Sequence, residues 1–461
     1  MTRRRSTAGL RLHAVVAMAT MVAGCASPKQ DAVTLPVQAA QWQGQTGSAA
    51  VTAQWWQQFQ DPVLTQLVEE AVAHNTDVRL ASARVDEARA LLRVQQAAEL
   101  PTLEAGGAAA RSDSISPVSR RPFYSGSYQE QFQASYELDV WGRLRALSQS
   151  ANARLVGAQS TRDAVALSIA ANTAQTYITL RALDERLDLA RQTLVSRQHA
   201  LEFARARLDS GYASKLELSQ AESELHVTAQ AVPQLQLSVA RTEHALCVLL
   251  GRPPGSVQRG LKLDQLALPP LPDAGVPSEL MRRRPDVAAN EAQVVASDAQ
   301  LAASRAQLLP SVRLSAAWGA VGSTIYFGDP FKVWSFGSSI LAPLFEGGRL
   351  RAQVDVGKSQ RDEALIAYEK TVLNAFSEVE DQLSAISLIQ REEAELDAQH
   401  VSTAEALRIA HDRYGAGYAT YLEELDAQRS LFGVEQQSVQ SRADLLVANV
   451  NLYKALGGGW R

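Results

Sequence analysis

The hydrophobic and polar residues of this chain follow two different periods, and each period predicts its own kind of element. Between residues 128 and 140 the two classes alternate, and only Glu130 falls on the otherwise apolar face. Residues 334–340 alternate in the same way, with Trp334, Phe336 and Ile340 on one side. A period of two predicts a β-strand with one apolar and one polar face. Two β-hairpins are therefore predicted, near residues 103–140 and 312–342, with loops at 111–127 and 319–332.

Long stretches without proline follow each predicted hairpin. No proline lies between Pro122 and Pro233, and none lies after Pro343. As one helix, residues 143–208 would extend about 100 Å at about 1.5 Å per residue, and so long a helix needs a partner along its length. Leucine recurs there at every seventh position, which predicts a coiled-coil seam: Leu180, Leu187, Leu194, Leu201 and Leu208. Three further helices are predicted, at 215–250, 349–413 and 421–456.

The chain also repeats itself. The sequence Gly-Arg-Leu-Arg-Ala begins at Gly142 and again at Gly348, and the sequence Gly-Tyr-Ala begins at Gly211 and again at Gly417. Both pairs are separated by 206 residues. A constant spacing over so long a stretch indicates two copies of one structural unit. We predict a first repeat over residues 61–271 and a second over 272–461, each with a helix, a β-hairpin, a very long helix and a final helix.

The N-terminal residues form a targeting segment. Four arginines accompany a short apolar run, residues 14–23, which is too short to span a bilayer and is typical of a signal peptide. The run ends in Val-Ala-Gly-Cys, a pattern that resembles the lipobox at which bacterial lipoproteins are cleaved and acylated. We expect residues 1–24 to be removed and Cys25 to carry the lipid, such as palmitate. The alternative is an ordinary signal peptide with an incidental cysteine. Ala26, in place of aspartate, favours the outer membrane as the destination.

Composition and motifs argue against several classes of protein. The formal net charge is −4, so no basic surface suggests a nucleic-acid partner. Seven histidines are scattered, without His-x-x-His or Cys-x-x-Cys spacing, and we find no phosphate loop or nucleophile elbow. We therefore expect no metal, no cofactor and no enzymatic activity. Cys247 is the only cysteine besides Cys25, and its apolar neighbours favour a buried, inert thiol.

The strands are the only segments suited to cross a membrane. No apolar run after residue 24 is long enough for a transmembrane helix. An apolar outer face and a polar inner face suit a lipid-exposed β-barrel with a wet lumen. Four strands cannot close a barrel, so copies of the chain must pool their strands: two copies give eight and three give twelve. The alternative is a pair of half-buried hairpins in a soluble protein.

The sequence resembles the outer membrane efflux protein family, the TolC-like channels, and most closely their lipoprotein (OprM/NodT) branch. The resemblance extends over nearly all of the mature chain. It is carried by residues 136–143 (Tyr-Glu-Leu-Asp-Val-Trp-Gly-Arg), 282–287 (Arg-Arg-Arg-Pro-Asp-Val) and 344–348 (Leu-Phe-Glu-Gly-Gly), and by two Arg-x-x-x-Gly turns.

The resemblance implies an α+β membrane protein. Its fold would be a trimeric, twelve-stranded outer-membrane β-barrel, with four strands per subunit, continued by a long periplasmic α-helical barrel. Residues 25–60, the lipid-anchored N-terminal segment, would contribute to an equatorial belt with part of 251–280. The implied function is a passive export duct for small molecules such as drugs. A periplasmic adaptor (membrane fusion) protein and an inner-membrane pump would deliver the substrate.

The resemblance also implies roles for particular residues. Leu422, Asp426 and Arg429 match the segment that narrows the periplasmic end, and would form a gate. Arg207, Gly211, Arg413 and Gly417 would lie at the adaptor-docking tips. Glu217 and Glu423 occur in both copies and would form acidic rings or a merely solvated face. Two alternatives stay open: a duct for protein (type I) secretion, and a periplasmic coiled-coil lipoprotein without a pore.

Overall fold

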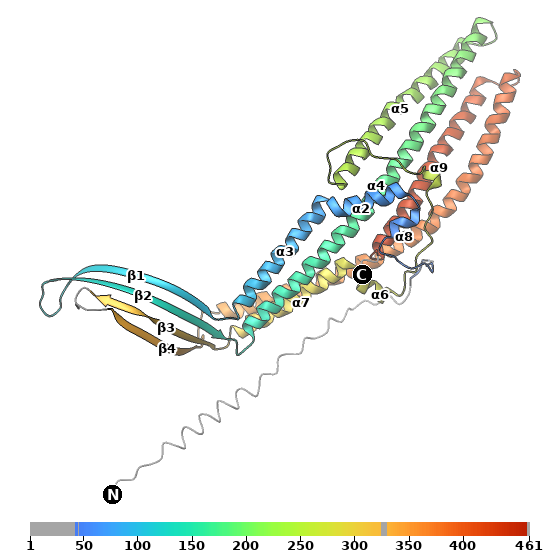
Figure 1. The fold of residues 1–461 in the computed structure, drawn as a ribbon. Coiled ribbons are helices and arrows are strands. Elements are labelled where there is room, and N and C mark those ends of the chain that lie inside the picture. The colour runs from blue at the N-terminus through green and yellow to red at the C-terminus, as the bar shows by residue number, and fades with distance from the viewer. Residues whose placement is uncertain (1–41, 45, 324–329, 459–461) are drawn as a thin grey trace. The chain divides into compact units, whose positions relative to one another are not determined.

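The computed structural model describes residues 42–44, 46–323 and 330–458. These residues belong to one compact unit, which runs from Val37 to Arg461. The signal peptide, 1–24, and the expected lipidation site, Cys25, lie outside the described residues, as does half of the segment 25–60. Figure 1 shows a four-stranded sheet at one end of a bundle of long helices.

The sheet contains the two predicted hairpins. Its strands are β1 (Thr102–Ile115), β2 (Pro122–Leu138), β3 (Ser311–Ser323) and β4 (Phe331–Leu341), all antiparallel and in the order β1-β2-β3-β4. Because side chains alternate between faces, the register places Phe132, Trp318 and Trp334 in one row on one face. The rings of Phe132 and Trp318 stack with centroids 6.1 Å apart. The residues that the pattern assigned to the apolar face therefore share that face.

The predicted loops are too long. β1 and β2 stay paired up to Ile115 and Pro122, so the first turn is confined to residues 116–121 instead of 111–127. The physical reason is that ladder hydrogen bonds are made by the backbone and tolerate any side chain. Serine and arginine, which we read as loop residues, pair across the strands, and the hydroxyls of Ser112 and Ser125 lie 2.8 Å apart. Residues 324–329 of the second connection lie outside the described part.

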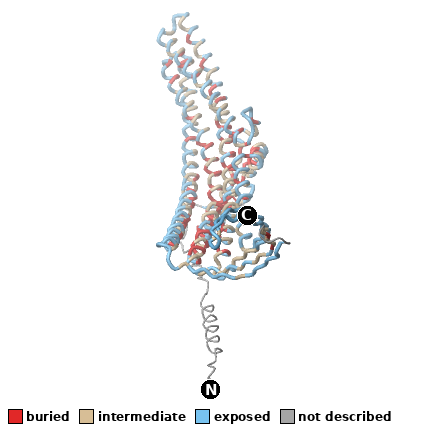
Figure 2. Tube along the Cα trace, turned by 90° about the vertical axis from the view of Figure 1, so that its left-hand side faces the viewer, coloured by how far each residue is buried: buried red, intermediate tan, exposed pale blue. Residues whose placement is uncertain are grey.

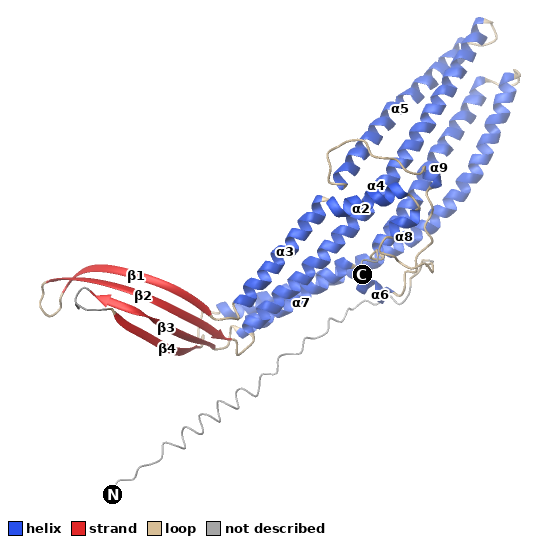
Figure 3. Ribbon diagram, in the orientation of Figure 1, coloured by secondary structure: helices blue, strands red, loops and turns tan. Residues whose placement is uncertain are grey.

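Two very long helices extend away from the sheet, as Figure 3 shows. They are α4 (Arg143–Asp209) and α8 (Arg349–Gly415), each of 67 residues. Each turns back into a 35-residue helix, α5 (Lys215–Leu249) after α4 and α9 (Tyr421–Ala455) after α8. α4 also packs against α9, so the two helical hairpins lie side by side. The leucine seam is fully buried at Leu180 and Leu187 and only partly buried farther along α4.

Shorter helices cover the sheet-proximal halves of the long ones. α3 (Thr76–Ala97) packs against α4, and α7 (Pro285–Ala306) packs against both α4 and α8. α2 (Pro62–His74) precedes α3, and the short α6 (Pro277–Arg283) precedes α7. In Figure 2 the buried residues lie mainly within the helical bundle, whereas the strands are mostly exposed. No helix in the described residues is both long and apolar enough to cross a membrane.

The motif at 136–143 joins sheet to helix. Gly142 adopts a positive φ of 74°, which directs the chain from β2 into α4. The carboxylate of Asp139 accepts the N–H groups of Leu144 and Arg145 at 3.0 and 2.9 Å and so caps α4. Burial raises the pKa of Asp139, but these two donors outweigh it and hold the pKa below its usual value. The Trp141 indole donates to the Pro310 carbonyl, which fastens the second repeat to the first.

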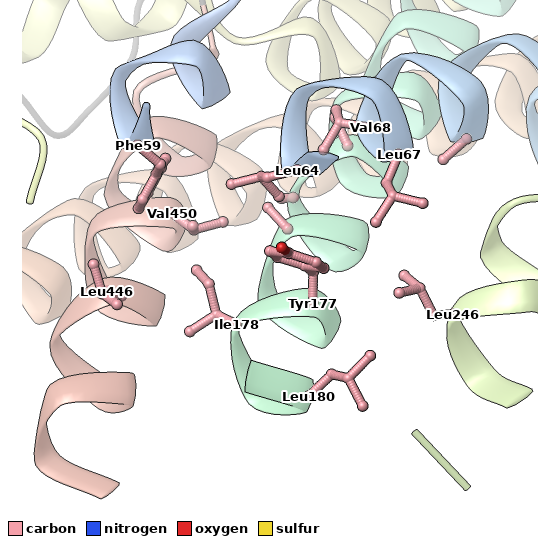
Figure 4. Close-up of a cluster of buried hydrophobic side chains, with 14 of the residues drawn as sticks. Phe59, Leu64, Leu67, Val68, Tyr177, Ile178, Leu180, Leu246, Leu446 and Val450 are labelled. Carbon is pink, nitrogen blue, oxygen red and sulfur yellow. The ribbon is translucent and has the colours of Figure 1, made fainter. Parts of the chain in front are cut away.

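The main core lies where the N-terminal segment meets both repeats. Trp55 and Phe59, in the 3-10 helix η1 (Trp55–Phe59), are fully buried against Tyr453 of α9, and Trp55 and Tyr453 stack with centroids 5.7 Å apart. Figure 4 shows Phe59, Leu64, Tyr177, Leu246 and Val450, which come from five different elements, around one apolar space. Cys247 is buried there too, as predicted.

A polar contact inside this core orients the N-terminal segment. Asp61 caps α2 through the Val63 N–H at 2.8 Å, and its other oxygen accepts the Tyr177 hydroxyl at 2.7 Å and the Leu261 N–H at 3.0 Å. Burial, followed by the Asp61 carboxylate, raises the pKa of Tyr177 well above its usual range. One carboxylate therefore joins α2, α4 and the segment that follows α5.

The Arg-Arg-Arg-Pro-Asp motif is also structural. Arg284 is buried and donates to Asp286 at 2.7 Å, to Glu378 of α8 at 2.6 Å and to the Ala455 carbonyl at 3.2 Å. Burial lowers the pKa of Arg284, but the two carboxylates outweigh it and raise the pKa above its usual value. Arg284 therefore holds the start of α7 against α8 and the end of α9.

Candidate functional site at the tips of the helical hairpins

Both helical hairpins turn by the same local geometry. Gly211 and Gly417 adopt φ angles of 76° and 79°, a region that non-glycine residues rarely occupy. In each turn an arginine four residues earlier donates to the carbonyl of the following tyrosine: Arg207 to Tyr212 at 3.3 Å, and Arg413 to Tyr418 at 3.4 Å. The Arg-x-x-x-Gly sequences are thus explained by the turn itself, since the glycine supplies the positive φ and the arginine donates to a carbonyl just beyond the helix end.

The turns leave large side chains exposed at the tip. Tyr212 and Tyr418 follow the two glycines and are 79% and 80% exposed. Leu216 and Leu422 are the second residues of α5 and α9 and are also exposed. The four residues form equivalent pairs in the two repeats, because each pair is separated by 206 residues. An exposed apolar and aromatic surface of this kind is typical of a site that another protein covers.

Aromatic contacts join the two tips to each other. Tyr414 and Tyr421 pack with Ala204 and Ala221 in a small buried cluster that includes both hairpins. The guanidinium of Arg207 lies 4.6 Å from the ring centroid of Tyr414, a cation–π contact between α4 and α8. The Tyr414 hydroxyl donates to Glu217 of α5. Burial, and then the Glu217 carboxylate, raises the pKa of Tyr414 well above its usual range.

The predicted gate residues lie on one face, but the arginine has a further partner. Asp426 and Arg429, three residues apart in sequence, are 3.8 Å apart on α9. Arg429 Nε also donates to Glu224 of α5 at 3.0 Å, and Glu224 is only 6% exposed. Hydrogen bonding to Glu224 raises the pKa of Arg429. Within one chain, therefore, Arg429 joins α9 of the second repeat to α5 of the first.

A buried arginine extends this contact. Arg197 of α4 is 4% exposed, donates to Gln428 of α9 and lies 4.0 Å from Glu224. Burial lowers the pKa of Arg197, and Glu224 opposes the effect. Gln428 donates in turn to Glu424 at 2.9 Å. These polar side chains form a continuous network across the α4, α5 and α9 helices, which we call the hairpin lock: Arg197, Glu224, Glu424, Gln428 and Arg429.

The network ends at a histidine on α8. His411 Nδ1 and Glu424 Oε1 are 2.8 Å apart, and the Glu424 carboxylate is almost completely buried. The hydrogen bond to Glu424 raises the pKa of His411 above its usual value. All four helices of the two hairpins therefore contribute a polar group to one connected set.

The two acidic residues shared by the repeats have different local roles. Glu217 accepts the Tyr414 hydroxyl and so contributes to the contact between the tips. Glu423 forms a capping box with Thr420 at the start of α9, and its carboxylate accepts the Thr420 N–H at 3.5 Å.

Sequence reasoning missed most of the hairpin lock. Glu224 lies 205 residues from Arg429, and no repeat or spacing indicated that the two are in contact. Arg197 lies between Leu194 and Leu201 of the predicted seam, and nothing in that pattern indicated a buried charge. Its neighbours Ser196 and Gln198 are polar, so the sequence carries no signal that Arg197 is buried.

Comparison with known proteins gives a consistent result. The family model described as outer membrane efflux protein matches residues 67–252 and 276–458. The pyoverdine export outer membrane protein OpmQ of Pseudomonas putida is 34% identical over 433 residues, covering 91% of this chain and 92% of that protein. The antibiotic efflux pump outer membrane protein ArpC of Pseudomonas putida is 33% identical over 469 residues, covering 97% of this chain and 96% of that protein.

Solved structures agree with the sequence comparisons. The outer-membrane channel OprN superposes with a TM-score of 0.87 and 30% identity, covering 94% of this chain and 99% of that one. The open state of the Neisseria gonorrhoeae MtrE outer membrane channel superposes with a TM-score of 0.85 and 30% identity, covering 94% of this chain and 98% of that one. The likeness therefore includes both the sheet and the long helices.

Proposed function

This chain belongs to the outer membrane efflux protein family, and we propose that it is the outer-membrane channel subunit of a tripartite efflux system. Three copies form a passive duct, in which four strands from each build a twelve-stranded barrel and the long helices continue the duct through the periplasm. A periplasmic adaptor and an inner-membrane pump supply the substrate. The protein carries out no chemical reaction in this role.

The two-faced sheet is the observation that carries the proposal. One face gathers Phe132, Trp318 and Trp334 in a row, and the opposite face of β2 carries Gln129, Gln131 and Gln133. Aromatic side chains exposed to water would be unfavourable, whereas the same face in contact with lipid is stabilised. The polar face then lines a wet lumen.

We propose small molecules as the substrate class. The printed names of the relatives refer to pyoverdine export, antibiotic efflux and toluene efflux, and these cargoes are small molecules. Those activities belong to the relatives, but they support small-molecule efflux by this chain over secretion of proteins. The lipobox ending at Cys25 favours the same branch of the family.

The hairpin tips are the proposed docking and gating region. Tyr212 and Tyr418, held outward by the turns at Gly211 and Gly417, offer the adaptor six similar tips per trimer. Leu422, Asp426 and Arg429 lie next to this surface on α9 and form the proposed gate. Because Arg429 also contacts Glu224, the gate is closed in part by a contact inside each chain.

Insertion into a bilayer tests the channel. We expect the purified protein to produce stepwise conductance in a planar lipid bilayer. Phe132→Lys, on the aromatic face, should strongly reduce insertion, because a lysine in the middle of the lipid-facing surface costs about 2–4 kcal/mol. Gln133→Lys is the matched control, because it adds the same charge to the next residue on the polar face. Equal insertion by both variants would contradict the assignment of the faces.

Export in cells tests the function. A strain that lacks this protein should become more susceptible to small hydrophobic antibiotics or solvents, and the wild-type gene should restore resistance. Secretion of proteins into the medium should be unchanged. If the deletion abolished secretion of a protein and left every small-molecule susceptibility unchanged, small-molecule efflux would be wrong.

A further inference from the structure

The sheet has two free edges, and they belong to different repeats. In the described chain, β1 pairs only with β2, and β4 pairs only with β3. Figure 3 shows these two strands at opposite edges of the sheet. An edge strand presents a row of unpaired N–H and C=O groups, which lipid cannot satisfy. If the aromatic face contacts lipid, as proposed above, both edges need a partner strand.

The internal duplication relates the two hairpins residue by residue. Pro101, before β1, corresponds to Pro310, before β3, with a shift of 209 residues; Gly142, after β2, corresponds to Gly348, after β4, with a shift of 206. The shift of 209 takes Thr102 of β1 to Ser311 of β3, and the shift of 206 takes Ser135 of β2 to Leu341 of β4. The observed pair Thr102↔Ser135 therefore corresponds to Ser311↔Leu341. That pair is present in the β3–β4 hairpin. The duplication therefore preserves strand register without a slip.

The same correspondence predicts a register for the two free edges. Within the chain, β2 of the first repeat pairs with β3 of the second. In the duplication β4 corresponds to β2, and β1 corresponds to β3. The contact equivalent to β2–β3 therefore joins β4 to β1 of another copy of the chain. The observed β2–β3 pairs then convert into four β4–β1 pairs: Trp334↔Asp113, Phe336↔Arg111, Ser338↔Ala109 and Ile340↔Gly107.

Two independent features of the edges support this register. First, it sets lipid-facing residues opposite lipid-facing residues, because Phe336 and Arg111 both occupy the aromatic face in the observed pairings. A shift by one residue would place the aromatic side chains of β4 opposite lumen-facing residues. The register thus continues both faces of the sheet across the junction.

Second, the register brings together charged side chains that have no partner within a single copy of the chain. Within the described residues, Arg111 and Asp113 of β1 and Lys332 of β4 make no hydrogen bond or ion pair through their side chains. In the predicted register Lys332 lies diagonal to Asp113 of the other copy, within reach of a long side chain. Arg111 lies opposite the ring of Phe336, an arrangement that permits a cation–π contact.

We propose that β4 of one copy pairs with β1 of the next in this register, with Phe336 opposite Arg111 and Lys332 diagonal to Asp113. Each copy uses two different edges, so the contact is head-to-tail and closes into a ring. The partner is a second copy of this chain, and the inference rests on the proposed outer-membrane channel. Its new content is the register and the charged residues that select it.

Disulfide cross-linking tests the register. In a Cys247→Ala background, Ala109→Cys with Ser338→Cys should give covalent oligomers on non-reducing gels, and so should Ala110→Cys with Gly337→Cys. Within one chain β1 and β4 are about 14 Å apart, since three spacings of about 4.8 Å separate them, and a disulfide cannot bridge that distance. Each variant with only one of the two introduced cysteines should give no covalent oligomer, which also controls for Cys25.

A displaced pair provides the matched control. Ala105→Cys with Ser338→Cys uses the same strands and the same face, but is four residues out of the predicted register. It should cross-link far less than the predicted pairs. Stronger cross-linking of the displaced pair, or none for any pair in a protein that native mass spectrometry shows to be oligomeric, would reject the register alone. A protein that remains monomeric would reject the proposed channel as well.

A charge exchange tests the selecting residues. Asp113→Lys should lower the temperature at which the oligomer dissociates on gels, because Lys332 of the next copy would then face a like charge. Combining it with Lys332→Asp should restore much of that temperature. If the double variant is no more stable than the sum of the single changes predicts, these two residues are not in contact.

Discussion

At the residue scale, the hairpin lock is built around carboxylates that the fold has removed from water. Glu224 and Glu424 are both almost completely buried, and each contacts a side chain of another helix: Glu224 accepts from Arg429 of α9, and Glu424 lies 2.8 Å from His411 of α8. Removing one partner of a buried ion pair strongly destabilises the fold, because the other group is left buried without compensation. The contacts in such a cluster therefore depend on one another. Arg197 and Glu224 lie more than 200 residues before their partners on α9, so these contacts form only when the two hairpins pack together.

The gate prediction belongs to this scale. Replacing Asp426 and Arg429 together with alanine should raise the open probability in a planar bilayer and let large antibiotics leak inward. An exposed pair contributes at most about 1 kcal/mol, but three copies act at one mouth, and Glu224 also loses its contact with Arg429. The measurement is single-channel recording on a correctly assembled oligomer.

The first repeat supplies the control for the gate. Gln220 and Ser223 are the residues that precede Asp426 and Arg429 by 206 positions, and they carry no charge. Their replacement with alanine should leave conductance near the wild-type value. Conductance as low as wild type in the Asp426→Ala, Arg429→Ala variant would show that these two residues do not hold the duct closed.

His411 gives the tip a pH-dependent contact. Its pKa is raised by the hydrogen bond to Glu424, so the protonated form is stabilised when the α8–α9 hairpin is folded. A group whose folded pKa is raised contributes stability that is complete below the unfolded value, about 6.5 for histidine, and is lost as pH rises through the folded pKa. The contact should therefore weaken on going from mildly acidic to alkaline medium.

Comparison with a histidine variant measures this effect. The thermal midpoint of the wild type should fall more than that of His411→Gln between pH 6 and pH 8.5. The difference should be small, because the imidazole is 73% exposed and solvent screens the pair. An NMR titration of the His411 ring should give a pKa above the usual histidine value. An identical pH response of wild type and variant would remove His411 as the source.

At the scale of elements, the hairpin turns are specified by short sequences that recur in both repeats. Gly211 and Gly417 supply the positive φ, and the arginine before each of them caps the carbonyl after it. The helix partners are not specified in that local way. α4 meets α9 through residue pairs such as Gln175 with Asn451, which only long-range packing brings to 2.6 Å.

Changing a turn should uncouple docking from assembly. Proline fixes φ near −65°, so Gly211→Pro or Gly417→Pro cannot keep the observed turn and should displace Tyr212 or Tyr418. Cross-linking to the periplasmic adaptor should fall while the channel oligomer stays intact. Gly433→Ala is the control, because a Cβ at this helical position in α9 meets nothing within 4 Å. Undiminished adaptor cross-linking and export in the proline variants would place docking elsewhere.

At the scale of the whole molecule, two different anchors hold the chain at the membrane in the proposed function. The sheet offers an aromatic face to lipid, and Cys25, outside the described residues, offers an acyl chain. A single acyl chain gives only marginal membrane binding, whereas a lipid-embedded barrel is far more stable. The lipid should therefore be dispensable for retention in the membrane.

Metabolic labelling checks the lipid anchor. A fatty-acid probe should label the wild type and fail to label Cys25→Ser. The variant should still fractionate with the outer membrane and conduct in a bilayer, provided that its signal peptide is cleaved by another route. Equal labelling of both proteins would show that the acylated residue is not Cys25.

The sequence by itself determined the elements and their duplication. Alternation identified the strands, proline-free stretches identified the long helices, and the shift of 206 residues identified two repeats, because these are properties of neighbouring positions. The repeated Gly-Tyr-Ala sequences, which are local too, contain the glycines of the two turns. Local reasoning failed at the loops between the strands, where backbone pairing continues regardless of side-chain polarity.

Only the tertiary structure decided which elements are neighbours. A helical period shows that a face is buried, but it carries no information about which helix covers that face. Packing alone decided that Glu224 is the partner of Arg429 and that Arg197 is buried. It also decided that Trp55, near the N-terminus, stacks on Tyr453, near the C-terminus. The physical reason is that hydrophobic burial is non-directional, whereas hydrogen bonds and ion pairs form only between groups that the packed helices have already brought within about 3 Å.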